Sequence, residues 1–422
     1  MESNEAQERD WSSLPPDVLN LIAKKVGEIT DFVRFRAVCT SWCSSTPVSS
    51  LPPQFPWIFR NHINPRDLKV AFYSIPLDKF YNFHTPNSFV KEFFVKEFKG
   101  PSEGYIYMLS RFYPHQNELN KQVTSSRQRN LKAVFADIWT GLVTGSRSNH
   151  YDRSSLQNIC GYSTLGPVIG QLSLFNPLNN HEFILPAYDF GEYAHYIGTW
   201  QNQLQEYVIC YGKSGLQNLI LVSWRPGQDN WHEVNLDSSY VTCSHFYLKR
   251  MLYSVERATG ITIITDIATG SLVCVVPPIE GYPNHIINYL VEASGDILRV
   301  IRYGDQGQQP PMCKPPMCEW FDVYKLDENK NGSPCWVKVT SIGDHALFID
   351  LHYALTLEAN DSAMIKRNSI YFMRLVGMNY MYRERPPLYD VKIMNIDTGA
   401  IEYLARDLSG SPQWFVPNLH HL

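Results

Sequence analysis

Two pairs of side chains in this sequence have the types and spacing from which metal or catalytic sites are built. Cys313 and Cys318 are separated by four intervening residues in the segment PPMCKPPMCEWF, and thiolates are common zinc ligands. This spacing lies outside the usual short zinc knuckle and no second cysteine pair follows, so a Pro-rich loop with two incidental thiols is the preferred interpretation. Asp344 and Asp350 could form the carboxylate pair of a glycosidase, but strand alternation and a turn position explain them equally well.

Other catalytic motifs are incomplete or missing. The sequence GKS at 212–214 has Tyr207 where a phosphate-binding loop requires its first glycine, so no phosphate cradle is expected. The H-E-x-x-H and G-x-S-x-G motifs are absent. His345 and His352 flank an apolar strand, where histidines are more often hydrogen-bonded structural residues than catalysts. We therefore predict no catalytic, cofactor-binding or metal-binding residues, and no enzyme activity.

The strongest signal is the segment LPPDVLNLIAKKVGEITDFVRFRAVCTSW at residues 14–42. It combines an L-P-x-D-x-L opening, short amphipathic stretches and a closing V-C-x-x-W. A unit below ~40 residues is too small to bury its own apolar side chains. A partner or a neighbouring domain must therefore cover the apolar residues of this segment, which are Leu14, Leu19, Ile22, Val38 and Trp42.

Bulk composition narrows the class of protein. The chain has 422 residues, 44% hydrophobic and 18% charged, enough for a core and for two or three domains. A formal net charge of −4 provides no excess of positive charge that would favour binding to nucleic acid or an anionic membrane. The polar N-terminus is no signal peptide, and no apolar run reaches a membrane span. With nine cysteines at irregular spacing, reduced thiols and a cytoplasmic or nuclear location are expected.

The elements that would position the N-terminal signal are three short helices. The pattern predicts a helix over 17–26 that ends at Gly27, a second over 32–38 capped by Thr30 or Asp31, and a short third turn that holds Trp42. Prolines then favour a semi-rigid linker. The predicted domains are 9–46 for the helical module, 47–62 for the Pro-rich linker and 63–422 for a β domain.

Short strand-like runs dominate the rest of the chain, as in LKVAFYSI, EYVICYG, ITIITDI and VKIMNI. Turns in which Asp precedes Gly are expected to join several of them, at Asp137–Gly141, Asp266–Gly270 and Asp397–Gly399. Successive glycines of these turns are 129 residues apart. This interval equals three units of 43 residues and suggests propeller blades of that length. A sandwich pair and a solenoid remain open, but the pattern favours a β-propeller of about six to eight blades, so the chain is mainly β with a small N-terminal α module.

The segment at residues 14–42 closely resembles the F-box. FNPLNNHEFILP (175–186), WVKVTSIGDHALFID (336–350) and the ending IMNIDTGAIEYL resemble plant F-box proteins with a KIB-type propeller. The resemblance implies a substrate-recognition subunit of a cullin-based ubiquitin ligase, which performs no covalent chemistry. Its F-box docks a Skp-family adaptor and its propeller binds an unknown target protein. The implied adaptor-binding residues are Leu14, Pro15, Leu19, Ile22, Val38, Cys39 and Trp42.

Two features depart from the family pattern. Cys43 follows the tryptophan where the family often has Arg, and the duplicated PPMC segment looks like a loop insertion. Two alternatives stay open. One is a propeller enzyme or glycan-binding protein whose N-terminal helices serve only for packing, and the other is an F-box protein that sequesters its partner without ubiquitination.

Overall fold

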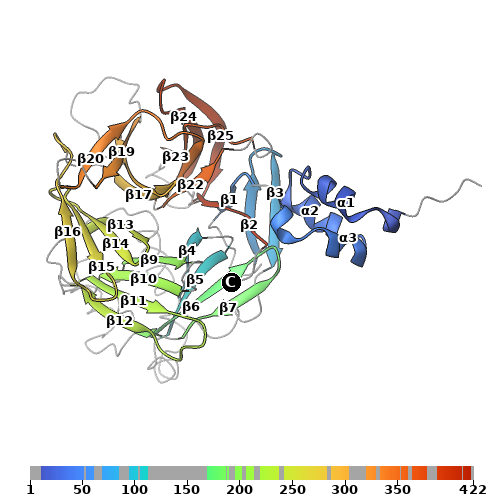
Figure 1. The fold of residues 1–422 in the computed structure, drawn as a ribbon, viewed down its shortest axis with the longest axis horizontal. Helices are drawn as coiled ribbons and strands as arrows, with labels where there is room; N and C mark the ends of the chain where they lie inside the picture. Colours follow the sequence, from blue (N-terminus) through green and yellow to red (C-terminus); the bar gives the residue numbers. More distant parts are fainter. Residues whose placement is uncertain are drawn as a thin grey trace, which may run out of the picture.

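A computed structural model shows a ring of β-sheets with a small helical module at its rim (Figure 1). The structure describes residues 11–51, 54–60, 69–84, 95–102, 105–112, 169–186, 188–189, 195–201, 206–212, 219–236, 242–282, 287–303, 320–328, 333–351, 353–359, 364–377, 387–410 and 412–419. The PPMC duplication, Lys213 and Ser214 of the GKS sequence, His352 and the predicted turn at Asp137–Gly141 lie outside the described residues.

The helical module consists of three α-helices flanked by two 3-10 turns. Its elements are η1 (Trp11–Ser13), α1 (Pro16–Ala23), α2 (Ile29–Arg36), α3 (Thr40–Ser45) and η2 (Val48–Ser50). Prolines at 15 and 16 suit the entry of α1, because the first helical amides need no intrahelical acceptor. The predicted cap of α2 is wrong: the helix begins at Ile29, so Thr30 and Asp31 lie inside its first turn and Glu28 holds the cap position.

The first three blades of the ring each contain four main strands among the described residues. Blade 1 has the order β26-β1-β2-β3, with β26 (Pro412–Phe415), β1 (Trp57–Arg60), β2 (Lys69–Ser74) and β3 (Lys79–His84). Blade 2 contains β4 (Val95–Ser102), β5 (Tyr105–Phe112), β6 (Ile169–Asn176) and β7 (His181–Ile184), with β8 (Tyr188–Asp189) beside β6. Blade 3 contains β12 (His232–Leu236), β11 (Leu219–Trp224), β10 (Glu206–Gly212) and β9 (His195–Gln201).

The remaining three blades complete the ring. Blade 4 contains β13 (Thr242–Leu248), β14 (Met251–Glu256), β15 (Thr262–Asp266) and β16 (Leu272–Val276). Blade 5 contains β17 (Ile287–Ala293), β18 (Asp296–Tyr303), β19 (Trp320–Asp327) and β20 (Cys335–Val339). Blade 6 has five strands in the order β22 (Ala354–Glu358), β21 (His345–Ile349), β23 (Ser369–Gly377), β24 (Leu388–Asn395) and β25 (Ile401–Ser409). The described part of the chain thus forms six blades, and the predicted propeller is confirmed.

The two ends of the propeller segment close the ring by pairing with each other. Strand β26 runs antiparallel to β1, with Trp57 opposite Phe415 and Arg60 opposite Pro412. Without this pair blade 1 would lack its innermost strand, so the last strand of the chain completes the blade that the first one begins. Arg60 strengthens the joint, because its guanidinium donates hydrogen bonds to the backbone carbonyl and hydroxyl of Ser409.

The two predicted Asp-Gly turns that the structure describes have the same hydrogen-bond geometry, but in one of them the first residue is not the predicted Asp. Gly270 has a φ of +69° and donates its amide to the Asp266 carbonyl at 2.8 Å. Gly399 does the same toward Asn395 at 2.9 Å, so Asn395 takes the role predicted for Asp397. The predicted 43-residue unit is wrong, because these glycines lie in blades 4 and 6 and their spacing therefore spans two blades rather than three.

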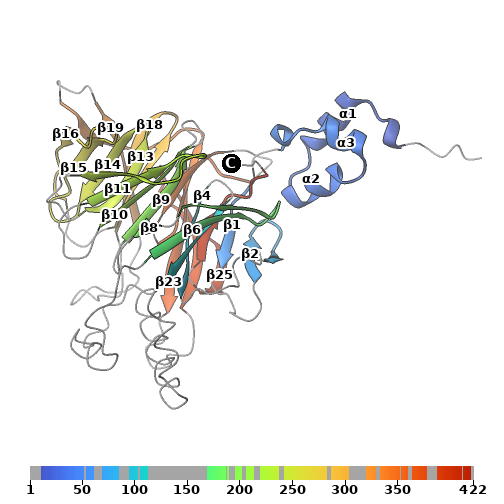
Figure 2. The same cartoon turned by 90° about the horizontal axis from the view of Figure 1, so that it is seen from below.

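The segment predicted as a linker, 47–62, contains residues bound to both domains. The Gln54 side chain accepts the backbone amide of Ile29 at 2.8 Å, and the Ser50 hydroxyl lies 2.8 Å from Oδ1 of Asn20. Phe55 packs on the other side against Phe348 of blade 6, with ring centroids 5.6 Å apart. Strand β1 also lies inside this segment, so the sheet begins at Trp57 rather than at residue 63. The helical module is therefore joined closely to the ring, from which it projects in both views (Figures 1 and 2).

Candidate functional site

Helix α1 is apolar on two different faces. Leu19 and Ala23, four residues apart, share one face and are fully buried. Val18, Leu21 and Ile22 share another face at i, i+3 and i+4, and they are 39%, 61% and 39% exposed. A helix that is apolar over so much of its surface normally lies in the interior of a larger assembly. The chain itself covers one face of α1 and leaves the other open to solvent.

Blade 1 covers the inner face of the module. One buried cluster contains side chains of both units: Ala23, Ile29 and Phe32 from the helices, with Trp57, Phe72 and Tyr81 among those from blade 1. Trp57 stacks on Tyr81 with centroids 4.6 Å apart, which forms a flat aromatic floor beneath the helices. The helical module and blade 1 therefore pack directly against each other on this face.

The apolar side chains that the module leaves exposed to solvent come from several elements, and together they are called its outer face. Besides the three residues of α1, the exposed set includes Trp11, Val33 and Val38. Val38 is 58% exposed in the turn between α2 and α3. So many exposed apolar side chains on so small a unit are typical of a protein-binding surface.

The seven predicted adaptor-binding residues occupy different environments. Pro15, Ile22 and Val38 are exposed, and Leu14, Cys39 and Trp42 are partly buried. Leu19 is fully buried, so in this conformation it packs inside the chain and offers no surface to a partner. Leu19 and Ile22, which the resemblance assigns to the same interface, therefore lie in different environments, one in the core and the other in contact with solvent.

Trp42 holds the module together internally. Its ring packs on Phe35 with centroids 4.5 Å apart, and its indole N–H donates to the Trp11 carbonyl at 3.0 Å. Its own carbonyl accepts the hydroxyl of Thr46 at 2.7 Å. Trp42 therefore fixes α3 against α2 and η1, and its partly exposed ring borders the outer face.

Sequence reasoning missed Leu21, Val18 and Val33 as surface residues. The signal that could have found the first two is the i, i+3, i+4 spacing with Ile22, which identifies a second apolar face of α1. Cys43, the departure from the family pattern, lies within 3.5 Å of Nη2 of Arg36, which donates to its sulfur. A guanidinium from α2 therefore lies beside position 43.

Where the helical module meets blade 1, the main electrostatic feature is the carboxyl group of Glu28, which lies at the N-cap position of α2. Burial of this carboxyl group raises its pKa above the ordinary value of 4.5, and nearby Asp31 raises it further, whereas Lys79 of blade 1 lowers it. Its Oε2 is buried and finds no hydrogen-bond donor within the described part of the chain. Glu28 is therefore a mildly unfavourable group at neutral pH.

The residues considered for catalysis are engaged in structural contacts. Asp344 pairs with Arg367 at 3.1 Å, whereas the buried Asp350 accepts the backbone amides of Tyr353 at 2.8 Å and Trp414 at 3.3 Å. His345 lies 3.3 Å from the Ser294 hydroxyl. Across the described residues, no group of three or more His, Cys, Asp or Glu side chains is placed to hold a metal ion.

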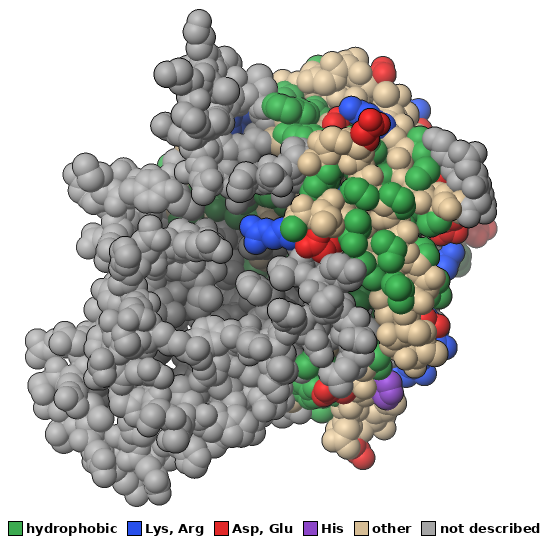
Figure 3. All heavy atoms as spheres, turned by 90° about the vertical axis from the view of Figure 1, so that its left-hand side faces the viewer, with side chains coloured by type: hydrophobic (Ala, Val, Ile, Leu, Met, Phe, Trp, Pro, Cys, Tyr) green, Lys and Arg blue, Asp and Glu red, His purple; other side chains and the backbone are tan. Residues whose placement is uncertain are grey.

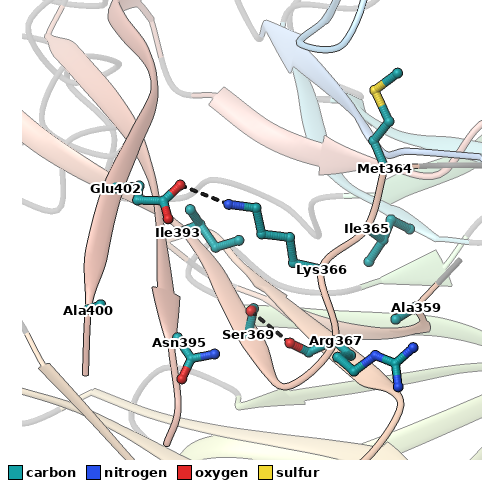
Figure 4. A pocket seen from close by; sticks show the side chains of 10 residues that line it. All are labelled: Ala359, Met364, Ile365, Lys366, Arg367, Ser369, Ile393, Asn395, Ala400 and Glu402. Atoms are coloured by element: carbon teal, nitrogen blue, oxygen red, sulfur yellow. Dashed lines mark hydrogen bonds and ion pairs between the residues drawn. The ribbon is translucent and has the colours of Figure 1, made fainter. Parts of the chain in front are cut away.

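An open pocket of about 540 Å³ lies on blade 6 beside the turn between β24 and β25 (Figure 4). Lys366 and Glu402 form an ion pair of 2.8 Å across it, and Arg367 at its edge is paired with Asp344. Met364 lies at the rim and is 68% exposed. Because its charged groups already neutralise one another, this pocket has little chemistry to offer a substrate.

The tryptophans of the ring occupy different environments. Trp224 and Trp414 are buried, and Trp414 donates its indole N–H to the Ile349 carbonyl at 3.1 Å. Trp320 differs, because it is 52% exposed and stacks on Tyr303 with centroids 5.0 Å apart.

Within the described residues, no helix is long and apolar enough to cross a membrane.

Comparison with known proteins gives consistent matches over nearly the whole chain. The model of the KIB1-4 beta-propeller family matches residues 154–397. Probable F-box protein At4g22060 of Arabidopsis thaliana is 22% identical, covering 98% of this chain and 97% of that protein. Putative F-box protein At4g22660 of the same plant is 24% identical over 100% of both chains. F-box protein SKIP23, also from Arabidopsis thaliana, is 50% identical over 44 residues, which are 10% of this chain and 11% of that protein.

Proposed function

Because this chain belongs to the KIB1-4 beta-propeller family and resembles plant F-box proteins over nearly its whole length, we propose that it is an F-box substrate adaptor of a cullin-based ubiquitin ligase. In this role the outer face of the helical module docks a Skp-family adaptor, which carries a cullin. The propeller binds a target protein in the cytoplasm or nucleus. The domain division follows the same roles, with the F-box at 9–46 and the target-binding propeller from Trp57 onward.

The observation that carries this proposal is the second apolar face of α1. Ala23 belongs to the cluster shared with blade 1 and Leu19 is fully buried, whereas Val18, Leu21 and Ile22 stay exposed. If the helices served only for packing, the chain would have no reason to expose a second apolar surface on α1. An adaptor that binds this surface would bury it, with Pro15 and Ile22 as contacts and Trp42 supporting them from within.

Such a protein acts by holding its two partners close together and performs no covalent chemistry. A target held on the propeller and an enzyme held through the F-box share one assembly, so the effective concentration of target lysines near the charged enzyme is high. The close joint between helices and ring supports this role, because a fixed geometry limits the positions that the target can take. The competing enzyme interpretation finds no support in Asp344 and Asp350, which are engaged by other groups.

The test is adaptor binding by the full-length chain. We expect wild-type protein to co-purify with a Skp-family adaptor and Leu21→Glu to lose this binding by about thirtyfold or more, because a charge would be buried at the interface. Leu77→Glu is the matched control, since Leu77 is 46% exposed in the turn between β2 and β3 and lies outside the helical module. Wild-type protein that captures no adaptor, or equal capture by both variants, would refute the proposal.

Ubiquitination of the target is a separate readout. Reconstitution with adaptor, cullin and charged enzyme distinguishes a ligase from a protein that only sequesters its partner. Ubiquitin transfer to a bound target supports the ligase, whereas stable binding of adaptor and target without transfer supports sequestration.

A further inference from the structure

The outer strand of each blade has one edge without a strand partner in the described part of the chain. These outer strands are β3, β7, β12, β16, β20 and β25. An unpaired edge presents backbone N–H and C=O groups on which another extended chain can pair, and proteins usually protect it with charged side chains. Five of these strands follow that rule, with Lys79, Glu182, Glu233, Lys338 and Glu402 respectively in β3, β7, β12, β20 and β25.

Strand β16 is the exception. Its sequence, Leu-Val-Cys-Val-Val, contains no polar or charged side chain apart from the weakly polar thiol of Cys274. Cys274 and Val276 face blade 5, where they belong to a cluster that includes Leu326. Because side chains alternate along a strand, Val275 points the other way, and it is 44% exposed.

The exposed part of β16 forms an apolar strip on the rim of blade 4. Leu272 and Val273 are 61% and 52% exposed, and the exposed Pro277 and Pro278 follow directly. Figure 3 shows this side of the molecule, where hydrophobic side chains gather on the surface with few charges among them. A bulge at Val273 and the two prolines limit the regular edge to a few residues.

We propose that β16 is a docking strand for a short extended segment of a partner protein, which pairs with the free edge and adds a strand to blade 4. Main-chain hydrogen bonds would supply much of the affinity, and apolar side chains at alternate positions would cover Leu272, Val273 and Val275. This mode of binding fits an edge that is both unpaired and apolar.

The size of the strip selects this occupant over a second copy of the chain. Five strand residues span only ~17 Å, whereas a stable contact between two folded proteins buries roughly 800 Å² on each side. A single extended segment needs no more than such an edge. The edge also lies across the ring from the helical module, so binding there does not require the adaptor (Figure 1).

Charges at one end of the strip indicate the chemistry of the segment. Lys249 and Arg250 are exposed in the turn between β13 and β14, and the Ile267 amide donates to the Arg250 carbonyl at 3.0 Å, which brings this turn beside the one that leads into β16. Asp266 at the same turn is occupied by the Ala268 amide at 2.7 Å. The preferred segment therefore has alternating β-branched residues followed or preceded by a carboxylate at that end.

The experiment selects phage-displayed random 12-residue peptides on the full-length protein and measures the enriched peptide by fluorescence anisotropy. We expect alternating apolar residues in the enriched peptide and about tenfold weaker binding to Val275→Lys and to Val273→Lys. Ile401→Lys is the matched control, because Ile401 is 39% exposed on β25, the outer strand of another blade. N-methylation of alternate peptide amides should abolish binding, and methylation of the intervening amides should not.

Three results would overturn the proposal. The first is that thermal melts show both lysine variants to be folded, yet no enriched peptide binds wild-type protein more tightly than it binds the variants. The second is equal sensitivity to methylation at every amide, which excludes strand pairing. The third is a concentration-dependent dimer in light scattering that Val275→Lys abolishes, which would assign the edge to a second copy of the chain.

Discussion

The inner and outer faces of the helical module are both apolar, yet they differ in what covers them. On the inner face, Phe32 and Ile29 join the aromatic cluster of blade 1 and are inaccessible to solvent. On the outer face, Leu21 and Val38 have the same hydrophobic character and remain largely exposed. The difference shows that hydrophobicity alone does not distinguish a core residue from a surface residue, because the tertiary contacts of the helix decide which side chains are buried.

The largest expected effect comes from Phe32→Ala on the inner face. Removing this buried ring leaves a cavity between α2 and blade 1 and should cost ~3–5 kcal/mol of folding stability. Chemical denaturation with both tryptophan fluorescence and circular dichroism measures the loss. Val33→Ala is the matched control, because the neighbouring Val33 is 38% exposed, and it should change stability little. Equal loss in both variants would mean that the two faces are not distinct.

The next effect concerns Val38→Asp on the outer face. A carboxylate there should weaken adaptor binding by ~2 kcal/mol or more, about thirtyfold, because the partner would have to desolvate a charge. The melting temperature should stay near that of wild-type protein, since Val38 is 58% exposed. Isothermal titration calorimetry paired with a thermal melt separates the two readouts. A lower melting temperature with intact adaptor binding would assign Val38 to the core.

Trp42 lies between the two faces and should show a smaller, mixed effect. Trp42→Phe keeps a ring against Phe35 but removes the indole donor to the Trp11 carbonyl, a loss of ~1 kcal/mol. We expect a slightly lower melting temperature and adaptor binding weakened by less than in Val38→Asp. If Trp42→Phe abolished adaptor binding without changing stability, Trp42 would be a direct contact rather than an internal support.

The smallest expected effect is a gain from Glu28→Gln. Burial raises the pKa of Glu28 in the folded protein, so the unfolded chain ionises at lower pH and the carboxylate costs stability as the pH rises above about 4.5. Removing the charge should therefore raise the melting temperature slightly at pH 7. Below the unfolded pKa both states are protonated, so the gain should vanish near pH 4. A gain that persists unchanged at pH 4 would exclude this electrostatic cause.

Local sequence signals predicted the elements well where the signal was itself local. The strand runs and the turns ending in Gly270 and Gly399 follow from β propensity and from positive φ, and both were found where expected. The cap of α2 was missed, because the Gln54 side chain that accepts the Ile29 amide comes from 25 residues away. The number of residues in a blade was also wrong, since the connections between strands differ in length and follow no local rule.

The candidate site was predicted as a segment but not as a surface. The L-P-x-D-x-L opening and the spacing of apolar residues determined by themselves that residues 14–42 form short helices with more apolar surface than they can bury. Only the tertiary structure decided that Leu19 lies inside while Val18, Leu21 and Ile22 lie outside. The reason is geometric: helical periodicity fixes the angles between side chains on α1, but the rotation of the helix is set by its packing, in which Ala23 joins the buried cluster that contains Trp57 and Tyr81 of blade 1.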